Sequence, residues 1–195
     1  MQLRPTANFP AASRIVLSEL ETRLPVLQGE AIRVDLKPQL TAYRGKLLSG
    51  RPGIGSAVHA ATFIRSRRIV LEKELLASFD GFRSIIIHEL FHFVWVRLGN
   101  PARQSFSRLL VEEWLARARG ELGESAAVRK SILMRKPNRE LGNRPWREYV
   151  CESFCDTAAW FYLPELTDPY RNLAIRWRER RKRWFSANLA GTLLC

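Results

Sequence analysis

Two histidines and a glutamate, spaced as H-E-x-x-H, are the residues of this chain best suited to chemistry. They are His88, Glu89 and His92, and they lie inside the strongest helical pattern of the sequence. Residues four apart on a helix lie one above the other, so both imidazoles can reach one metal ion from the same face. Glu89 then lies beside the metal, where it can act as general base towards a water whose pKa a zinc ion lowers to about 7. The alternative is a pair of packed histidines on a core-facing helix, which would leave ionisable groups buried without a partner.

A catalytic zinc site usually has a third protein ligand. The chain has three histidines, and none follows His92; the remaining one, His59, lies upstream in a predicted strand. The metzincin pattern would need a glycine at position 95 and a histidine at position 98, but the chain has Trp95 and Leu98. The third ligand is therefore expected to be a carboxylate or a thiolate.

A predicted helix over residues 146–162 offers such ligands at high density. Its acids and thiols fall within an arc of about 140°, and they are Glu148, Cys151, Glu152, Cys155 and Asp156. Glu152 lies at the centre of this arc, and Asp156 is placed to hydrogen-bond the outer nitrogen of a ligating histidine. The alternatives are Cys155 or Glu148 as the ligand, packing roles for the two cysteines, and acids exposed on an amphipathic helix.

The two segments together resemble a known family. H-E-L-F-H on one helix, followed by E-S-F-C-D on a later one, is similar to the H-E-x-x-H plus E-x-x-x-D pattern of the gluzincin metallopeptidases. The small size resembles the minigluzincins and the related domain of ImmA/IrrE-type proteases. The resemblance implies a zincin-like fold and a zinc-dependent peptidase, with zinc on His88, His92 and Glu152. It also implies Glu89 as general base and acid, and Asp156 as the residue that orients a ligating histidine.

In folds of this kind an edge strand pairs with an extended peptide substrate. The candidate segment is residues 56–64, and its proposed substrate-binding residues are Ser56, Ala57, Val58, His59 and Ala60. The group that stabilises the oxyanion is left open among three side chains, which are Tyr149, Tyr162 and His59.

The elements that must position these residues follow an α+β pattern. Helical spacing is present over residues 11–24, 80–98, 104–119, 146–162 and 171–189. Alternating or apolar strand patterns cover residues 31–36, 56–64 and 67–72, with a turn at Ser66–Arg67 between the last two. Residues 120–145 are predicted to be irregular. We expect one zincin-like domain over 1–195, with a small antiparallel or mixed sheet before the motif helix, a mostly helical C-terminal part, and residues 171–195 as a basic helix and tail.

Composition indicates a soluble globular protein. Of the 195 residues, 46% are hydrophobic and 26% charged. No apolar run approaches the roughly 18 residues of a membrane span, and the N-terminus lacks a signal-peptide pattern, so we expect a cytoplasmic protein. Three cysteines, an odd number, argue against a disulfide scaffold.

The formal net charge of +13 is the unusual global property. The excess is spread over both halves of the chain, which favours background composition over a dedicated binding arm. Residues 171–189 combine arginines with tryptophans, and two interpretations follow. The stretch is either a basic aromatic surface for nucleic acid or an anionic membrane, or a solvated arginine face whose apolar residues (Leu173, Ile175, Trp177 and Trp184) pack on the domain.

The second interpretation of residues 171–189 is favoured, and the expected partner is a peptide or protein substrate. The alternative to a peptidase is a non-catalytic or regulatory zinc-binding protein with a basic C-terminal surface. The apolar tail, A-G-T-L-L-C, is expected to lie in a cleft.

Overall fold

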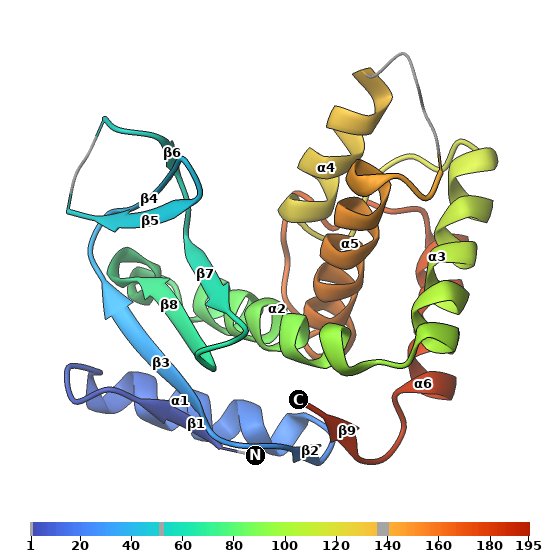
Figure 1. The fold of residues 1–195 in the computed structure, drawn as a ribbon. Helices are drawn as coiled ribbons and strands as arrows, with labels where there is room; N and C mark the ends of the chain where they lie inside the picture. The colour runs from blue at the N-terminus through green and yellow to red at the C-terminus, as the bar shows by residue number, and fades with distance from the viewer. Residues whose placement is uncertain (1, 51–52, 136–140) are drawn as a thin grey trace. The chain divides into compact units, whose positions relative to one another are not determined.

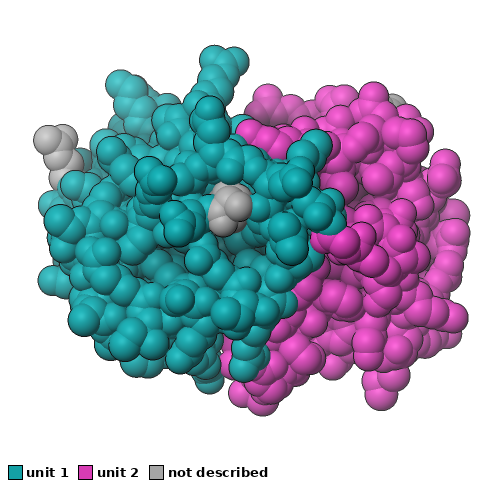
Figure 2. Space-filling model, turned by 90° about the horizontal axis from the view of Figure 1, so that it is seen from below, with its two compact units in different colours: residues 1–93, 192–195 teal, residues 94–191 magenta. Residues whose placement is uncertain are grey.

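The computed structural model describes residues 2–50, 53–135 and 141–195 (Figure 1). The chain divides into two compact units: unit 1 comprises residues 1–93 and 192–195, and unit 2 comprises residues 94–191 (Figure 2). Within the described ranges, every helix is too short or too polar to span a lipid bilayer. The single domain expected over 1–195 stays a prediction.

A four-stranded mixed sheet forms the centre of unit 1. Its strand order is β1 (Leu3–Pro5), β3 (Ile32–Lys37), β8 (Arg68–Glu72) and β7 (Ala60–Phe63). The first three strands run parallel, and β7 is antiparallel to β8. Val34 and Ile69 face each other in the two inner strands and are fully buried. The expected α+β class with a small mixed sheet is confirmed.

The predicted hairpin between residues 56 and 72 is only partly right. β7 and β8 pair as expected, and Ile64–Arg67 form the turn, which Arg67 N–H closes on Ile64 O. The single strand expected over 56–64 is wrong, because the backbone changes partner in its middle. Val58 N–H donates to Leu40 O, whereas His59 O accepts from Glu72 N–H.

A second, antiparallel sheet uses the first part of that segment. Its order is β5 (Lys46–Ser49), β4 (Leu40–Tyr43) and β6 (Ser56–Ala57). Arg44 and Gly45 join β4 to β5 with φ values of 47° and 75°. Two consecutive positive φ angles are what a tight two-residue hairpin requires, and they match the right-handed twist of the strands.

The helices expected over 11–24 and 80–98 are α1 (Ala11–Arg23) and α2 (Phe79–Arg97). Near the start of α2, Gly81 N–H donates to the Ser78 hydroxyl. Phe82, Ile86 and Leu90 recur every four residues along α2 and are fully buried. This stripe is the apolar face that fixes the rotation of the motif helix about its axis.

The C-terminal tail forms a strand in unit 1. β9 (Leu193–Leu194) pairs parallel with β2 (Leu27–Gln28), and Cys195 N–H donates to Gln28 O. Gly29 has a φ of 142°, and a Cβ there would lie 2.2 Å from Cys195 O. The close approach of the β2 and β9 segments therefore requires glycine at this position.

Unit 2 consists of helices packed around α5. They are α3 (Asn100–Leu115), α4 (Glu124–Arg135), α5 (Arg144–Tyr162) and α6 (Ile175–Asn188), and α5 contacts each of the other three. An aromatic core joins α3, α5 and α6: the centroid of the Phe106 ring lies 5.5 Å from that of Phe154 and 4.9 Å from that of Trp184. The side chain of Asn143 accepts from Trp146 N–H and caps α5.

Three expectations about unit 2 are wrong. Residues 120–145 contain α4 rather than only irregular chain, and residues 136–140 lie outside the described residues. The last helix begins at Ile175 instead of at residue 171. Ile175 does not pack on the domain, since it is 75% exposed, whereas Trp177 and Trp184 are buried as expected.

Candidate metal centre

The two motif histidines share one face of α2. Their ring centroids are 5.0 Å apart and the ring planes meet at 77°. His88 is buried, His92 is half-buried, and the turn that carries them also holds the fully buried Leu90 and Phe91. Two imidazoles therefore lie close together in a largely apolar segment, as the spacing predicted.

Glu89 is held by the sheet of unit 1. Thr62 on β7 donates a hydrogen bond from Oγ1 to Glu89 Oε2 at 2.6 Å. The same hydroxyl lies 3.1 Å from the Glu89 carbonyl oxygen. Sequence reasoning missed Thr62, because no local pattern joins a strand residue to a helix residue 27 positions later.

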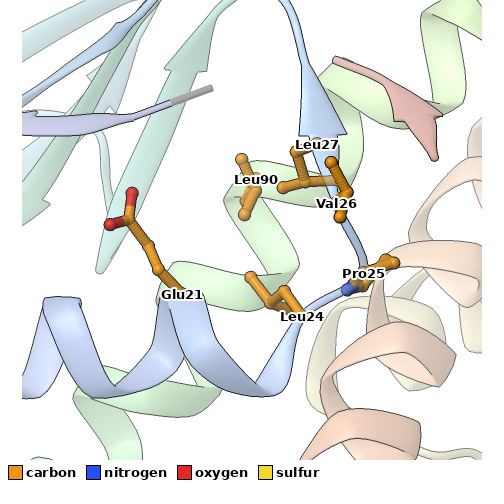
Figure 3. A pocket seen from close by; sticks show the side chains of 6 residues that line it. All are labelled: Glu21, Leu24, Pro25, Val26, Leu27 and Leu90. Atoms are coloured by element: carbon orange, nitrogen blue, oxygen red, sulfur yellow. The ribbon is translucent and has the colours of Figure 1, made fainter. Parts of the chain in front are cut away.

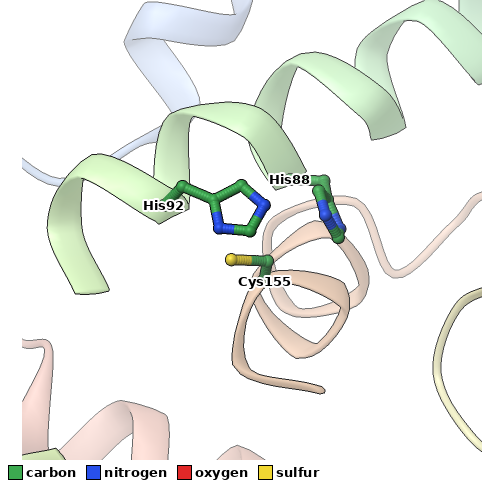
Figure 4. A group of neighbouring side chains, drawn as sticks. All are labelled: His88, His92 and Cys155. Atoms are coloured by element: carbon green, nitrogen blue, oxygen red, sulfur yellow. The ribbon is translucent and has the colours of Figure 1, made fainter. Parts of the chain in front are cut away.

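The structure contains one group of residues suited to a metal ion in the part of the chain that it describes. It comprises His88, His92 and Cys155 of α5, whose possible ligand atoms all lie within 4.8 Å of one another (Figure 4). Burial raises the pKa of the Cys155 thiol well above its ordinary value, and Cys151 raises it further. Two imidazole nitrogens and one sulfur form a donor set that suits zinc and leaves a fourth position for water.

The predicted ligand Glu152 is half-buried on the same helix and is not a member of that group. Glu148, the other carboxylate alternative, is engaged elsewhere: it forms ion pairs with Arg129 at 3.1 Å and Arg144 at 2.9 Å. The thiolate alternative, Cys155, is therefore the candidate that lies with the histidines. Glu152 as ligand stays a prediction.

Asp156 is buried and contacts the first turn of α4. Its Oδ2 accepts a hydrogen bond from Ala126 N–H at 2.8 Å. A Cβ on Gly123 would lie 2.4 Å from the Asp156 carboxyl carbon, so this position accepts only glycine without rearrangement. A carboxylate at a helix N-terminus satisfies a backbone donor and stabilises the helix dipole. The predicted role of Asp156 towards a ligating histidine is not tested by this contact.

The three oxyanion candidates lie in different surroundings. His59 is exposed, and its Nδ1 lies 2.9 Å from Glu72 Oε2. Tyr149 is fully buried and donates its hydroxyl proton to Glu121 Oε1 at 2.6 Å. Tyr162 ends α5, and burial raises its pKa to about 12. The contact of Tyr149 with Glu121 favours a structural role for that side chain.

The proposed substrate-binding residues do not form one strand. Ser56 and Ala57 pair with β4 in the three-stranded sheet, whereas Ala60 begins β7. Val58 and His59 connect the two. β7 is at one end of the four-stranded sheet, so Ala60 is the member of this set that lies on the strand carrying Thr62.

A buried ionic network holds α5 in unit 2. Arg181 of α6 forms a two-pronged ion pair with Glu113 of α3 and lies 3.0 Å from Glu121 Oε2. Lys130 of α4 and Tyr149 of α5 also contact Glu121. Although burial opposes its ionisation, Arg181 and Lys130 hold the pKa of Glu121 below its ordinary value.

The network corrects the expectation that the C-terminal arginines form a solvated face or a binding surface throughout. Arg181 is fully buried, and Arg171 is 8% exposed. Arg171 donates to the carbonyl oxygens of Leu163 and Leu166. The sequence gives no sign of this, because the acidic partners of Arg181 lie about 60 to 70 positions earlier.

A pocket of about 200 Å³ lies in unit 1 where α1 ends (Figure 3). Its lining is mainly aliphatic and includes Leu90 of the motif helix. The carboxylate in its wall, Glu21, already accepts a hydrogen bond from Leu3 N–H at 2.7 Å. Neither motif histidine lines this pocket, so it is separate from the metal group.

Comparison of the chain with protein-family models, with curated proteins and with solved structures found no match.

Proposed function

We propose that the protein is a zinc-dependent peptidase in which the metal is held by His88, His92 and a third ligand from α5. The observation that supports this is the group of two imidazoles and one thiol with donor atoms within 4.8 Å of one another. A glutamate follows the first histidine directly, as a hydrolytic H-E-x-x-H site requires. Structural zinc sites, in contrast, are usually closed by four cysteine or histidine ligands.

Each residue of the motif has a separate task in this proposal. Zinc, when bound, supplies a Lewis acid that polarises a peptide carbonyl and lowers the pKa of a coordinated water to about 7. Glu89 accepts the proton of the attacking water and then delivers it to the leaving amine. Thr62 holds the Glu89 carboxylate in place through the 2.6 Å hydrogen bond.

The third ligand is proposed to be Cys155. This departs from the gluzincin pattern, in which the resemblance assigns the position to Glu152. A thiolate is a good zinc ligand, and two neutral imidazoles with one thiolate leave a net positive charge on the zinc site, which a second thiolate would cancel. Glu152 lies three residues before Cys155 on the same helix. It is the alternative ligand that the experiment must distinguish from Cys155.

The metal content of protein purified without added zinc tests the proposal. We expect close to one zinc ion per chain in the unaltered protein and a strong loss in His92→Ala and Cys155→Ala. Cys151→Ser is the matched control, because it removes the neighbouring half-buried thiol one helical turn earlier. Glu152→Gln should keep its zinc if Cys155 is the ligand and lose it if the glutamate is.

Two further readouts make the test decisive. Cobalt substitution should give a thiolate-to-metal charge-transfer band in the unaltered protein and in Glu152→Gln, but not in Cys155→Ala. Hydrolysis of a mixed peptide library should stop on chelation and return with zinc. Full metal loading of His92→Ala, or hydrolysis that is indifferent to chelation, would show the proposal to be wrong.

A further inference from the structure

Helices α3 and α6 pack side by side in opposite directions within unit 2 (Figure 1). Trp184 near the end of α6 donates to Ser105 near the start of α3 at 3.0 Å. At the other end, Arg180 forms an ion pair with Glu112. The last turn of α3 therefore lies beside the first turns of α6.

Arginines are concentrated along this helix pair. Those that are exposed and have no acidic partner at ion-pair distance among the described residues are Arg108, Arg117, Arg119, Arg176 and Arg183. We call these five, with the aliphatic residues Leu115 and Ile175, the α3/α6 surface. Glu112 is neutralised by Arg180, and Glu179 is the exposed acid that offsets part of the charge. The surface is strongly basic.

Arg117 occupies a backbone position that does not suit its side chain. It follows the C-cap residue Ala116 of α3, and its φ is 53°. Glycine is the usual residue at such a position, because a Cβ is strained in the left-handed region. An exposed arginine there is unfavourable for the helix end, and what it adds to this surface is a positive charge.

The aliphatic members of the surface are unusual. Leu115 is 71% exposed and Ile175 is 75% exposed, more than any other large hydrophobic side chain in the described residues. Leu115 ends α3 and Ile175 begins α6, so the two lie at the same end of the helix pair as Arg117, Arg119 and Arg176. Two protruding aliphatic side chains are thus surrounded by cations.

The two tryptophans of α6 are not available for stacking on nucleic-acid bases. Trp177 and Trp184 are buried. Arg176 and Arg180 lie over the Trp177 ring at 4.9 and 5.2 Å from its centroid. Sequence-tolerant binding of single strands depends on exposed aromatic platforms, and the α3/α6 surface has none among its described residues.

We propose that the α3/α6 surface docks on an anionic lipid membrane. The arginines would contact lipid phosphate and carboxylate groups, and Leu115 and Ile175 would enter the boundary between headgroups and acyl chains. A lipid membrane contacts both the arginines and the two aliphatic residues of the surface, whereas a nucleic-acid backbone would contact only the arginines. This proposal is independent of the metal centre and goes beyond the proposed peptidase activity.

Vesicle co-sedimentation of the full chain tests the proposal. We expect binding to vesicles of phosphatidylcholine with phosphatidylserine, little binding to phosphatidylcholine alone, and weakening as salt is added. Arg117→Gln/Arg119→Gln should weaken binding about thirtyfold, because each arginine near an anionic surface contributes roughly a factor of five. The matched control is Arg135→Gln/Arg147→Gln, which makes the same charge change at exposed positions of α4 and α5.

The contribution of the two aliphatic residues is tested separately with Leu115→Ser/Ile175→Ser. This double variant should weaken vesicle binding about tenfold without changing the net charge. Val128→Ser/Met134→Ser is its control on the exposed side of α4. Thermal unfolding of every variant establishes that the fold is kept. Equal losses in test and control pairs, or duplex DNA or RNA binding that exceeds vesicle binding at the same salt, would overturn the proposal.

Discussion

Thr62 Oγ1 lies 2.6 Å from Glu89 Oε2, so a hydroxyl on the end strand of the mixed sheet holds the carboxylate of the motif helix. Glu89 is 8% exposed, and a hydrogen bond to a charged group at this burial is stronger than one at the surface. The contact fixes one oxygen of the carboxylate. The other oxygen can then present a constant position to a water molecule.

Glu89→Gln should abolish peptide hydrolysis without removing the metal. The amide keeps the size of the side chain and can still accept from Thr62, but it cannot take a proton from water. We expect hydrolysis to fall by about 10²- to 10⁴-fold, the usual contribution of a general base. Peptide turnover and zinc content are measured on the same preparation, with Glu74→Gln as the exposed control. Native turnover in Glu89→Gln would contradict the assigned role.

Thr62→Val should lower kcat while leaving KM and metal content unchanged. Valine keeps the shape of the side chain but loses the donor to Glu89, and hydrogen bonds to charged groups contribute about 1.5 to 3 kcal/mol. This corresponds to a loss of roughly tenfold to a hundredfold in rate. Thr62→Ser retains the hydroxyl and should stay close to the unaltered enzyme. Equal behaviour of the two variants would exclude a positioning role.

Zinc affinity should fall as the pH is lowered, and Cys155 should account for part of the slope. Burial, together with Cys151 and Glu152, raises the pKa of the Cys155 thiol, so the metal must displace its proton. Below that pKa, this group alone weakens zinc binding about tenfold per pH unit. Chelator competition at several pH values measures it. Cys155→Ala should bind more weakly with a shallower slope, and an unchanged slope would count against the thiolate.

Local periodicity was sufficient to predict the elements that carry the candidate site. The four-residue spacing of His88 and His92 required a helix, and α2 contains both. The density of acids and thiols between residues 146 and 162 marked α5, which begins at Arg144. The hairpin of β7 and β8 followed from two apolar runs with a short connection.

Contacts between distant residues could not be predicted in this way. Thr62 and Glu89 are 27 positions apart, and neither has a sequence feature that points to the other. The first turn of α4 has a backbone N–H, that of Ala126, bound by Asp156, which lies 30 positions later and could not be inferred from local sequence. Among the thiols and acids of α5, helical geometry placed five side chains on one arc but could not rank Cys155 above Glu152.

Tyr149 should make the stability of the protein fall at alkaline pH. Burial, and then the negative charge of Glu121, raises the pKa of Tyr149 well above 10. In the unfolded chain a tyrosine has a pKa of about 10, so Tyr149 makes its full contribution to the free energy of unfolding below that pH. As the pH rises further, only the unfolded state loses the proton, and the free energy of unfolding falls by up to about 1.4 kcal/mol per pH unit.

Urea unfolding between neutral pH and about pH 11 measures this alkaline slope. Tyr149→Phe should be less stable at neutral pH, because Glu121 loses a donor, and should show a shallower slope. Tyr170→Phe is the exposed control and should behave like the unaltered chain. Tyr162, whose pKa burial raises to about 12, adds a slope of the same sign in both variants. Identical slopes in Tyr149→Phe and the control would refute the assignment.

Arg181→Met should destabilise the protein by about 3 to 5 kcal/mol, because it leaves Glu113 and Glu121 buried with too little positive charge. Lys130 still contacts Glu121, so Glu113 is the carboxylate that loses its main partner. The double variant Arg181→Met/Glu113→Gln should therefore recover much of the loss, and a double-mutant cycle in urea gives the coupling energy. Arg180→Met breaks the partly exposed pair with Glu112 and should cost about 1 kcal/mol or less. If Arg180→Met and Arg181→Met lowered the free energy of unfolding by the same amount, the contribution of the Arg181 network to stability would not depend on its burial.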